Sequence, residues 1–391
     1  MNSKENNINF ITGFKGWLAL LVVIHHFGLV FFPSLVNGDG RYLFISKKMT
    51  KTIIQSPFNF IGYGGALAVS FFFIISGYLI AKKSYNKSID ISNKMLDRYK
   101  KLVRPVLYSS LFALVLVTIC KKIDLFWNPW LSSFSYYKNV EPNIILCLYQ
   151  SFVDTFATGM AIYNPPLWTM SSELLGSLFL YILFHIFKNK KNFYYILFLI
   201  LLIFLRSNIA YFILGVFVEK FEREGYFKSI KNNAIIKILL FIFCIYLFGF
   251  TYLSCSAKSY EVLNKLVTFK YTIIDSVTFV RYISSVLFFI LLLNSKILIK
   301  IFSFKISYLL GKISLPMYLL HWPILYTIII YITYKFNCFI NNKTLVVLGS
   351  LFLFVLICII SSIVYNKLSK KVDSIISSKS IITILEAFRS N

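Results

Sequence analysis

The sequence predicts an all-α fold: a polytopic integral membrane bundle of about ten transmembrane helices with both termini in the cytoplasm. Of the 391 residues, 58% are hydrophobic and only 14% are charged, and the mean hydropathy is +0.73. A soluble domain usually has about 25% charged residues and 45–50% apolar residues. Apolar runs of about 20 residues recur along the chain, and they match a hydrocarbon core about 30 Å thick. These observations exclude a soluble enzyme, a disordered chain and a small disulfide-stabilised domain.

Ten apolar runs are the candidate membrane spans, and an eleventh stretch is less regular. The eleventh, at residues 143–162, is apolar but is interrupted by Gln150, Ser151, Asp154 and Thr155. The ten candidates lie at approximately residues 15–33, 59–81, 104–120, 167–187, 193–206, 208–220, 234–253, 276–294, 313–335 and 344–366.

The basic residues predict the direction in which these spans cross. The net charge is +26, from 41 Lys and Arg against 15 Asp and Glu. With ten spans and a cytoplasmic amino terminus, most Lys and Arg fall in cytoplasmic segments, as the positive-inside rule requires. If residues 143–162 also crossed, the basic segment at 188–191 and the basic tail would lie outside. We therefore expect 143–162 to be an external or re-entrant helix, and we assign the positive charge to membrane orientation rather than to nucleic-acid binding.

One membrane domain, residues 1–366, accounts for most of the chain. Residues 367–391 are basic and amphipathic, and we expect this tail to lie on the cytoplasmic surface of the bilayer. The six cysteines include no CxxC pair and no spacing typical of a zinc site, so the sequence predicts no bound metal.

All four histidines, His25, His26, His185 and His321, fall in predicted spans, where ionisable side chains are costly and often functional. Lys15 and His26 are eleven residues apart, so they share one helix face, separated by about 16 Å along the axis. His25 points about 100° away from His26, and which of the two rings acts stays open. A cation at one end and an imidazole halfway across suit a ligand with a phosphate head and a long thin arm, such as coenzyme A. His185 is expected at the membrane interface.

A basic cluster at residues 98–104 is a second candidate for phosphate binding. Lys101 and Arg104 are spaced i, i+3 and share a helix face, and Arg98 lies one turn earlier. Two cations on one face can hold a pyrophosphate. Simple orientation charge explains the cluster equally well.

Glu173 and His321 are the remaining candidates for proton chemistry. Glu173 lies within the fourth predicted span, close to Trp168 and Ser172, and the residue three positions before it is not a capping Ser or Thr. A carboxylate at such a place can orient an imidazole or balance its charge during proton transfer. His321 lies between Pro316 and Pro323, which free backbone carbonyls that a cavity or a neighbouring helix must satisfy.

Five fragments in this order together resemble the membrane acyltransferase type 3 family. They are Phe14-Lys15-Gly16 with the run to His26-Phe27, the segment 64–80 ending in Ser-Gly-Tyr-Leu-Ile, Lys101-x-x-Arg104, the segment 164–173, and the segment 310–323. The resemblance covers about 310 residues, and the span count is similar to the ten that are usual in that family.

The resemblance implies transfer of an acyl group, usually acetyl from cytoplasmic acetyl-CoA, to a hydroxyl of a surface carbohydrate or lipid-linked glycan. The family's basic-x10-His motif falls on Lys15 and His26, and its paired-basic motif falls on Lys101 and Arg104, with Lys in place of the first Arg. We expect His26 or His25 to act as general base or acyl carrier, supported by Glu173 or His321. We expect Lys15, Arg98, Lys101 and Arg104 to hold the coenzyme phosphates, and Trp168, Ser172 and Tyr78 to contact the acceptor.

A transporter or flippase of lipid-linked sugars is the competing interpretation, because such proteins also place charges in spans. The chain lacks the repeated halves that are common in transporters. We expect a multi-pass protein of the bacterial inner membrane. The acceptor (O-antigen, capsule, exopolysaccharide, glycolipid or an amine), the choice of acetyl or succinyl, and a homodimer are left open.

Overall fold

The computed structural model describes residues 3–40, 44–85, 91–268 and 274–376. Within these ranges the regular structure is entirely helical and contains no strand, which confirms the all-α prediction. The longer helices are α1 (Ser3–Phe31), α4 (Phe60–Ser84), α5 (Ile91–Lys122), α9 (Trp168–Phe187), α10 (Phe193–Ile203), α11 (Ile209–Arg223), α13 (Ala234–Phe248), α15 (Ser276–Asn294), α18 (Ser314–Ile324), α19 (Ile330–Phe339) and α20 (Lys343–Ile376).

Short helices and turns connect these elements. Two π-helical turns, Gln150–Asp154 and Leu325–Ile329, interrupt longer helical segments, and a 3-10 turn at Pro165–Leu167 leads into α9. The short helices are α2 (Pro33–Val36), α3 (Lys47–Ile54), α6 (Pro129–Phe134), α7 (Ile144–Tyr149), α8 (Thr155–Ala157), α12 (Lys228–Asn232), α14 (Glu261–Val267), α16 (Lys296–Ser303) and α17 (Lys305–Lys312).

Seven helical segments within the described ranges are long and apolar enough to cross a membrane. They correspond to seven of the ten predicted spans, so the chain is a multi-pass membrane protein. The other three predicted spans correspond to the shorter helices α10, α11 and α13. The 11 residues of α10 are only about 17 Å long, well short of a 30 Å hydrocarbon core. The total of ten spans and the cytoplasmic termini therefore stay predictions.

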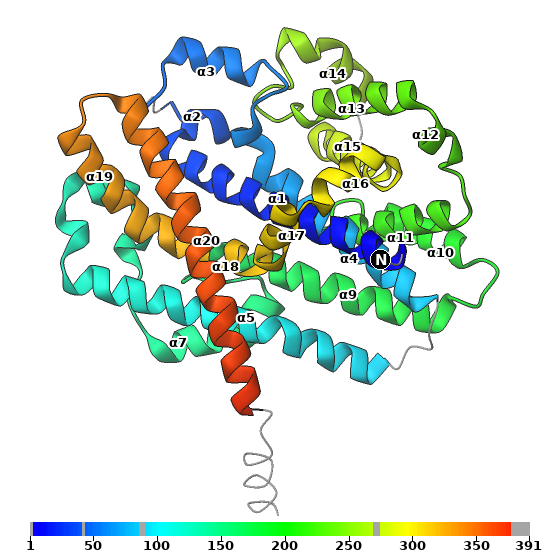
Figure 1. Ribbon diagram of the computed structural model, residues 1–391, viewed down its shortest axis with the longest axis horizontal. Coiled ribbons are helices and arrows are strands. Elements are labelled where there is room, and N and C mark those ends of the chain that lie inside the picture. Colours follow the sequence, from blue (N-terminus) through cyan, green and yellow to red (C-terminus); the bar gives the residue numbers. More distant parts are fainter. Residues whose placement is uncertain (1–2, 41–43, 86–90, 269–273, 377–391) are drawn as a thin grey trace, which may run out of the picture.

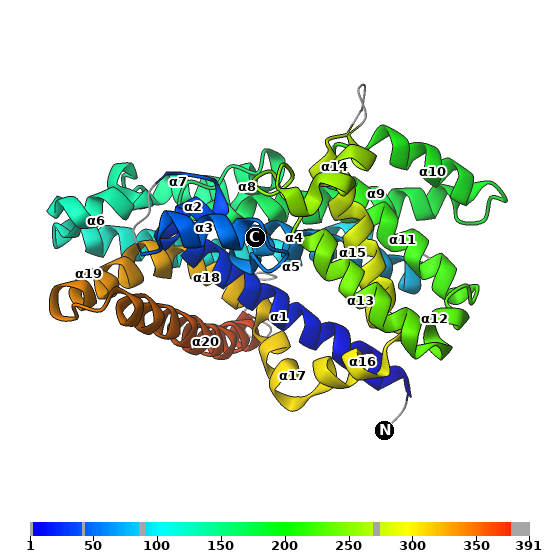
Figure 2. The same cartoon turned by 90° about the horizontal axis from the view of Figure 1, so that it is seen from above.

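Helix α1 occupies the middle of the bundle, where it packs against α4, α17 and α18 (Figures 1 and 2). Helices α1 and α4 run antiparallel: Phe14 contacts Phe71 near one end of the pair, and Gly28 contacts Ile61 near the other. Since the two helices run in opposite directions, early residues of α1 lie level with late residues of α4.

Helices α4 and α11 cross in close backbone contact. A Cβ added at Gly77 would lie 2.0 Å from the Phe212 carbonyl oxygen, and one added at Gly215 would lie 2.2 Å from the Ile74 carbonyl oxygen. Two glycines therefore let the two backbones touch.

The irregular stretch at residues 143–162 and the first part of the predicted tail are both helical. Residues 144–157 form the apolar helices α7 and α8 with a π turn between them, and they lie along α5 and α9. Helix α20 continues from Lys343 through the predicted domain boundary at residue 366 to Ile376 (Figure 1). The rest of the predicted tail, residues 377–391, lies outside the described residues.

Candidate functional site

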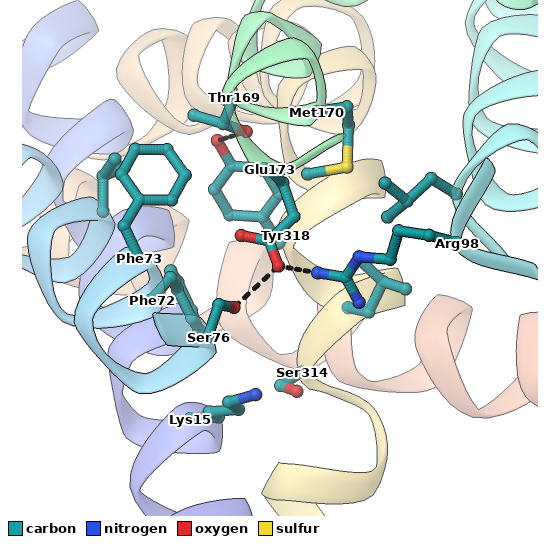
Figure 3. A pocket seen from close by; sticks show the side chains of 13 residues that line it. Lys15, Phe72, Phe73, Ser76, Arg98, Thr169, Met170, Glu173, Ser314 and Tyr318 are labelled. Carbon is teal, nitrogen blue, oxygen red and sulfur yellow. Dashed lines mark hydrogen bonds and ion pairs between the residues drawn. The ribbon is translucent and has the colours of Figure 1, made fainter. Parts of the chain in front are cut away.

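Two pockets lie at different levels along the same helices. The first, which we call the Lys15 pocket, has a volume of about 220 Å³, and its polar lining is Lys15, Ser76, Arg98, Thr169, Glu173 and Ser314 (Figure 3). The second, which we call the His26 pocket, has a volume of about 320 Å³, and its polar lining includes His25, His26, Trp168, Asn208, Tyr211 and Arg281.

The antiparallel pair α1 and α4 shows how the pockets are stacked. Lys15 of α1 and Ser76 of α4 line the Lys15 pocket, whereas His26 and Gly65 of the same helices line the His26 pocket. Val69 and Tyr318 line both pockets and therefore form the wall between them.

Tyr318 is held in this wall by contacts of its hydroxyl and of its ring. Its hydroxyl lies 2.9 Å from the Thr169 hydroxyl and donates to the Pro166 carbonyl oxygen, also at 2.9 Å. Its side chain is buried, and its ring makes an edge-to-face contact with Phe72. The wall thus consists of a fixed aromatic ring with its hydroxyl tied to the start of α9.

Glu173 pairs with a cation in the Lys15 pocket and forms no hydrogen bond with a histidine among the described residues. One of its carboxylate oxygens accepts hydrogen bonds from the Arg98 guanidinium and, at 2.6 Å, from the Ser76 hydroxyl (Figure 3). Arg98 also donates from Nε to the Ser177 hydroxyl at 3.1 Å. Lys15 enters the same pocket from α1, so two cations and one carboxylate face this space.

His321 and His26 form a hydrogen-bonded chain with the Tyr318 carbonyl, and this chain defines the tautomer of each ring. His321 Nδ1 lies 2.6 Å from the Tyr318 carbonyl oxygen, and His321 Nε2 lies 3.1 Å from His26 Nδ1. Since a carbonyl only accepts, the neutral His321 ring carries its hydrogen on Nδ1 and accepts at Nε2. His26 Nδ1 then donates, both to His321 and to the Val22 carbonyl at 3.0 Å. The lone pair of His26 is therefore on Nε2, for which no partner exists among the described residues.

His25 lies in the same pocket but outside this chain. Its Nδ1 donates to the Ile61 carbonyl oxygen at 2.7 Å, so its Nε2 also carries a lone pair. The ring rests against Gly65, where an added Cβ would lie 2.3 Å from His25 Cδ2. Both adjacent histidines thus face one pocket, although only His26 contacts His321.

Pro316 and Pro323, on either side of His321, each leave one backbone carbonyl without its usual helical donor. Proline has no N–H to donate to the carbonyl four residues earlier, here that of Leu319. Asn164 Nδ2 donates to this carbonyl instead, at 2.7 Å. Similarly, the Lys312 carbonyl, four residues before Pro316, accepts from Asn366 Nδ2 at 3.0 Å. The predicted need for neighbouring groups to satisfy these carbonyls is confirmed.

A third pocket of about 440 Å³, the basic pocket, borders the Lys15 pocket at Leu315. Lys100, Lys101, Arg104 and Lys312 line it, together with Asp97. Lys101 and Arg104 therefore share a face of α5, as their spacing predicts. Arg98 faces the Lys15 pocket on the adjoining side of the same helix.

The candidate acceptor residues are distributed over two places. Trp168 lines the His26 pocket, and Ser172 accepts a hydrogen bond of 3.0 Å from Asn208, another residue of that pocket. Tyr78 lies elsewhere: it is fully buried, donates to Glu222 at 2.6 Å and accepts from Lys82 at 2.7 Å. The structure therefore places Tyr78 in the contact between α4 and α11.

The structure adds site residues that sequence reasoning missed. Their only sequence signals are polarity within apolar runs and, for Arg281, a charge within a predicted span. These residues are Ser76, Thr169, Asn208, Tyr211, Arg281 and Tyr318. Among the described residues, no group of three or more His, Cys, Asp or Glu side chains is arranged to hold a metal ion. His185 is exposed near the end of α9, outside all three pockets.

One comparison with known proteins identifies a family. Residues 8–365 match the family model described as "Acyltransferase domain". No curated protein and no solved structure matches the chain.

Proposed function

Because the chain belongs to the membrane acyltransferase 3 family, whose model covers residues 8–365, we propose that it moves an acetyl group from acetyl-CoA to a hydroxyl of a surface or lipid-linked carbohydrate. The observation that carries this proposal is the hydrogen-bonded chain Tyr318–His321–His26. It leaves His26 with an unprotonated Nε2 in a pocket next to a second pocket lined by cations.

The Lys15 pocket and the basic pocket are the proposed donor site. Coenzyme A carries a phosphorylated head and a narrow arm that ends in the thioester. In the basic pocket, Lys101 and Arg104 offer two cations on one helix face for the phosphates. Lys15 and Arg98 lie in the adjoining Lys15 pocket, where they can contact the rest of the coenzyme. Lys101 has the same charge as the Arg that is usual at this position of the motif. Its ammonium group cannot make the two parallel hydrogen bonds with a phosphate that a guanidinium makes.

For Glu173 we propose a different role from the one expected from the sequence. Its pairing with Arg98 and Ser76 supports a positioning role in the donor site, with Arg98 held in place by a charge-assisted hydrogen bond. We therefore propose His321, rather than Glu173, as the group that supports His26.

His26 Nε2 then removes the proton of the acceptor hydroxyl while the hydroxyl oxygen attacks the thioester carbonyl. The C–S bond breaks, the ester C–O bond forms, and the imidazolium returns its proton to the coenzyme A thiolate. His321 Nε2 accepts from His26 Nδ1 and so stabilises the positive charge that forms on the His26 ring. A route through a transient acyl-imidazole uses the same Nε2 as nucleophile.

The predicted orientation places the donor site on the cytoplasmic side, where acetyl-CoA is available, and the His26 pocket on the opposite side. A bacterial inner membrane fits this arrangement. Family membership favours acyl transfer over the competing interpretation, transport of lipid-linked sugars.

The test is acetyl transfer from labelled acetyl-CoA to the glycan fraction of membranes that contain the protein. His26→Ala should lower the rate by about 100-fold or more, in the range that general base catalysis contributes. His185→Ala is the matched control, because it removes a histidine that lies outside the pockets, and it should retain the wild-type rate. Full activity in His26→Ala at an equal protein level would reject the assignment and favour His25. No transfer by the wild type into a host glycan pool would reject acyl transfer to carbohydrate.

A further inference from the structure

Arg281 is a charged residue that lines the His26 pocket, and it takes no part in the acyl-transfer steps proposed above. It lies in the second turn of α15, six residues after Asp275, which caps that helix. It is half-buried and lines the pocket that also contains His25 and His26. A cation within a membrane span is costly unless it faces a cavity or a partner. Arg281 is therefore a candidate for a functional residue.

The pocket supplies no negative charge to balance Arg281. Its described lining contains no Asp or Glu, and no ion pair of Arg281 occurs among the described residues. The Tyr211 hydroxyl lies close to the guanidinium, and both side chains line the pocket. A guanidinium has five N–H donors, so it can also bind a ligand. Asp275 interacts with Arg281 at longer range, but its carboxylate accepts from the Thr278 backbone N–H at 2.9 Å and from the Tyr252 hydroxyl at 2.8 Å.

The other walls of the pocket suit a sugar. Trp168 is 43% exposed and offers a flat aromatic face on which the C–H face of a sugar ring can stack. Asn208 donates its amide N–H to Ser172, which leaves the amide oxygen as an acceptor for a sugar hydroxyl. An aromatic face, an amide and a guanidinium thus surround the two histidines.

We propose that the His26 pocket binds a sugar that carries an anionic group, and that Arg281 binds this group so that a hydroxyl of the same sugar reaches His26. This inference rests on the proposed function, because it specifies the acceptor of the same reaction. The anion is a carboxylate, as in a uronic acid, or a phosphate, as in a glycosyl phosphate. Both match the fork of N–H donors on a guanidinium.

The experiment measures ligand binding and does not depend on turnover. Protein in nanodiscs is heated with methyl glucuronide, glucose 1-phosphate or neutral methyl glucoside, and the shift in unfolding temperature against concentration gives each affinity. The two anionic probes separate a carboxylate from a phosphate as the preferred group. The variants are Arg281→Gln, Arg281→Lys and the matched control Arg206→Gln, which removes an arginine that does not line the pocket.

The expected result is binding of at least one anionic probe more tightly than methyl glucoside. Arg281→Gln should weaken that binding about tenfold or more, as expected for the loss of a charge-assisted hydrogen bond. Arg281→Lys should keep part of the affinity and also shows that the site still folds. Arg206→Gln should bind as the wild type does. Equal binding of all three probes, no binding of any, or unchanged anion binding by folded Arg281→Gln would overturn the proposal.

A parallel titration with coenzyme A separates this inference from the proposed function. Protection by coenzyme A that survives in Arg281→Gln, together with a failed sugar-anion test, rejects only the acceptor class. Protection by the anionic sugar without any protection by coenzyme A instead rejects the donor site of the proposed function.

Discussion

Replacement of Asn164 by Ala should destabilise the bundle, because the asparagine satisfies a carbonyl that Pro323 leaves without its helical donor. Asn164 is fully buried, and its Nδ2 lies 2.7 Å from the Leu319 carbonyl oxygen. A buried carbonyl left without a partner costs about 1–3 kcal/mol. The Asn164 Oδ1 is itself buried without a partner among the described residues, so its removal offsets part of this loss. We expect a net loss of about 1–2 kcal/mol in the free energy of unfolding.

A double-mutant cycle gives this reasoning its sharpest test. In Pro323→Ala, the new backbone N–H can donate to Leu319, so the asparagine becomes dispensable. Asn164→Ala should therefore cost about 1 kcal/mol less in the Pro323→Ala background than in the wild type. The assay is reversible unfolding in mixed detergent micelles, with Asn192→Ala as a control, because Asn192 is exposed and its side chain makes no capping hydrogen bond to α10. A coupling energy of zero between Asn164 and Pro323 would refute the reasoning.

Two further substitutions test the separate pockets. Gly65→Ala should displace the His25 ring, since the new Cβ would lie 2.3 Å from His25 Cδ2. We expect at least a tenfold lower acetyl-transfer rate with an unchanged KM for acetyl-CoA, and a wild-type rate would show that the position of His25 is unimportant. Lys15→Gln should instead raise the KM for acetyl-CoA about tenfold, which corresponds to one charge-assisted contact of about 1.4 kcal/mol. Lys48→Gln, an exposed lysine of α3, is its control, and equal KM values for the two variants would contradict a donor role for Lys15.

The helical face that Lys15 and His26 share was predictable, but the wall between their pockets was not. An interval of eleven residues defines an angle and a rise within one helix. Tyr318 enters between them from α18, and nothing in the sequence states which side chain of a distant helix fills a gap. The sequence consequently predicts one helix face with Lys15 and His26, whereas in the structure these residues line two pockets that share Val69 and Tyr318.

The partners of the polar groups were harder to predict than their importance. Glu173 and His321 are both ionisable residues within predicted spans, where such side chains are costly enough to indicate function. Their pairing depends on tertiary packing: His321 meets His26 across α18 and α1, and Glu173 meets Arg98 across α9 and α5. Periodicity within one helix carries no information about such pairs. Likewise, we expect Tyr78 to contact the acceptor, and the structure places it between α4 and α11.

The side chain and the main-chain carbonyl of Tyr318 contribute to the site in different ways. Its ring and hydroxyl separate the pockets, whereas its main-chain carbonyl orients His321. Rotation about the Cα–Cβ bond moves the ring and leaves the carbonyl in place. Removal of the ring from the wall would cost its two hydroxyl contacts, each worth about 1 kcal/mol, whereas the main-chain carbonyl that accepts from His321 would stay in place. A smaller residue at position 318 should therefore widen the connection between the two pockets and keep the main-chain carbonyl that orients His321, although it also removes the contact between the Tyr318 and His321 rings.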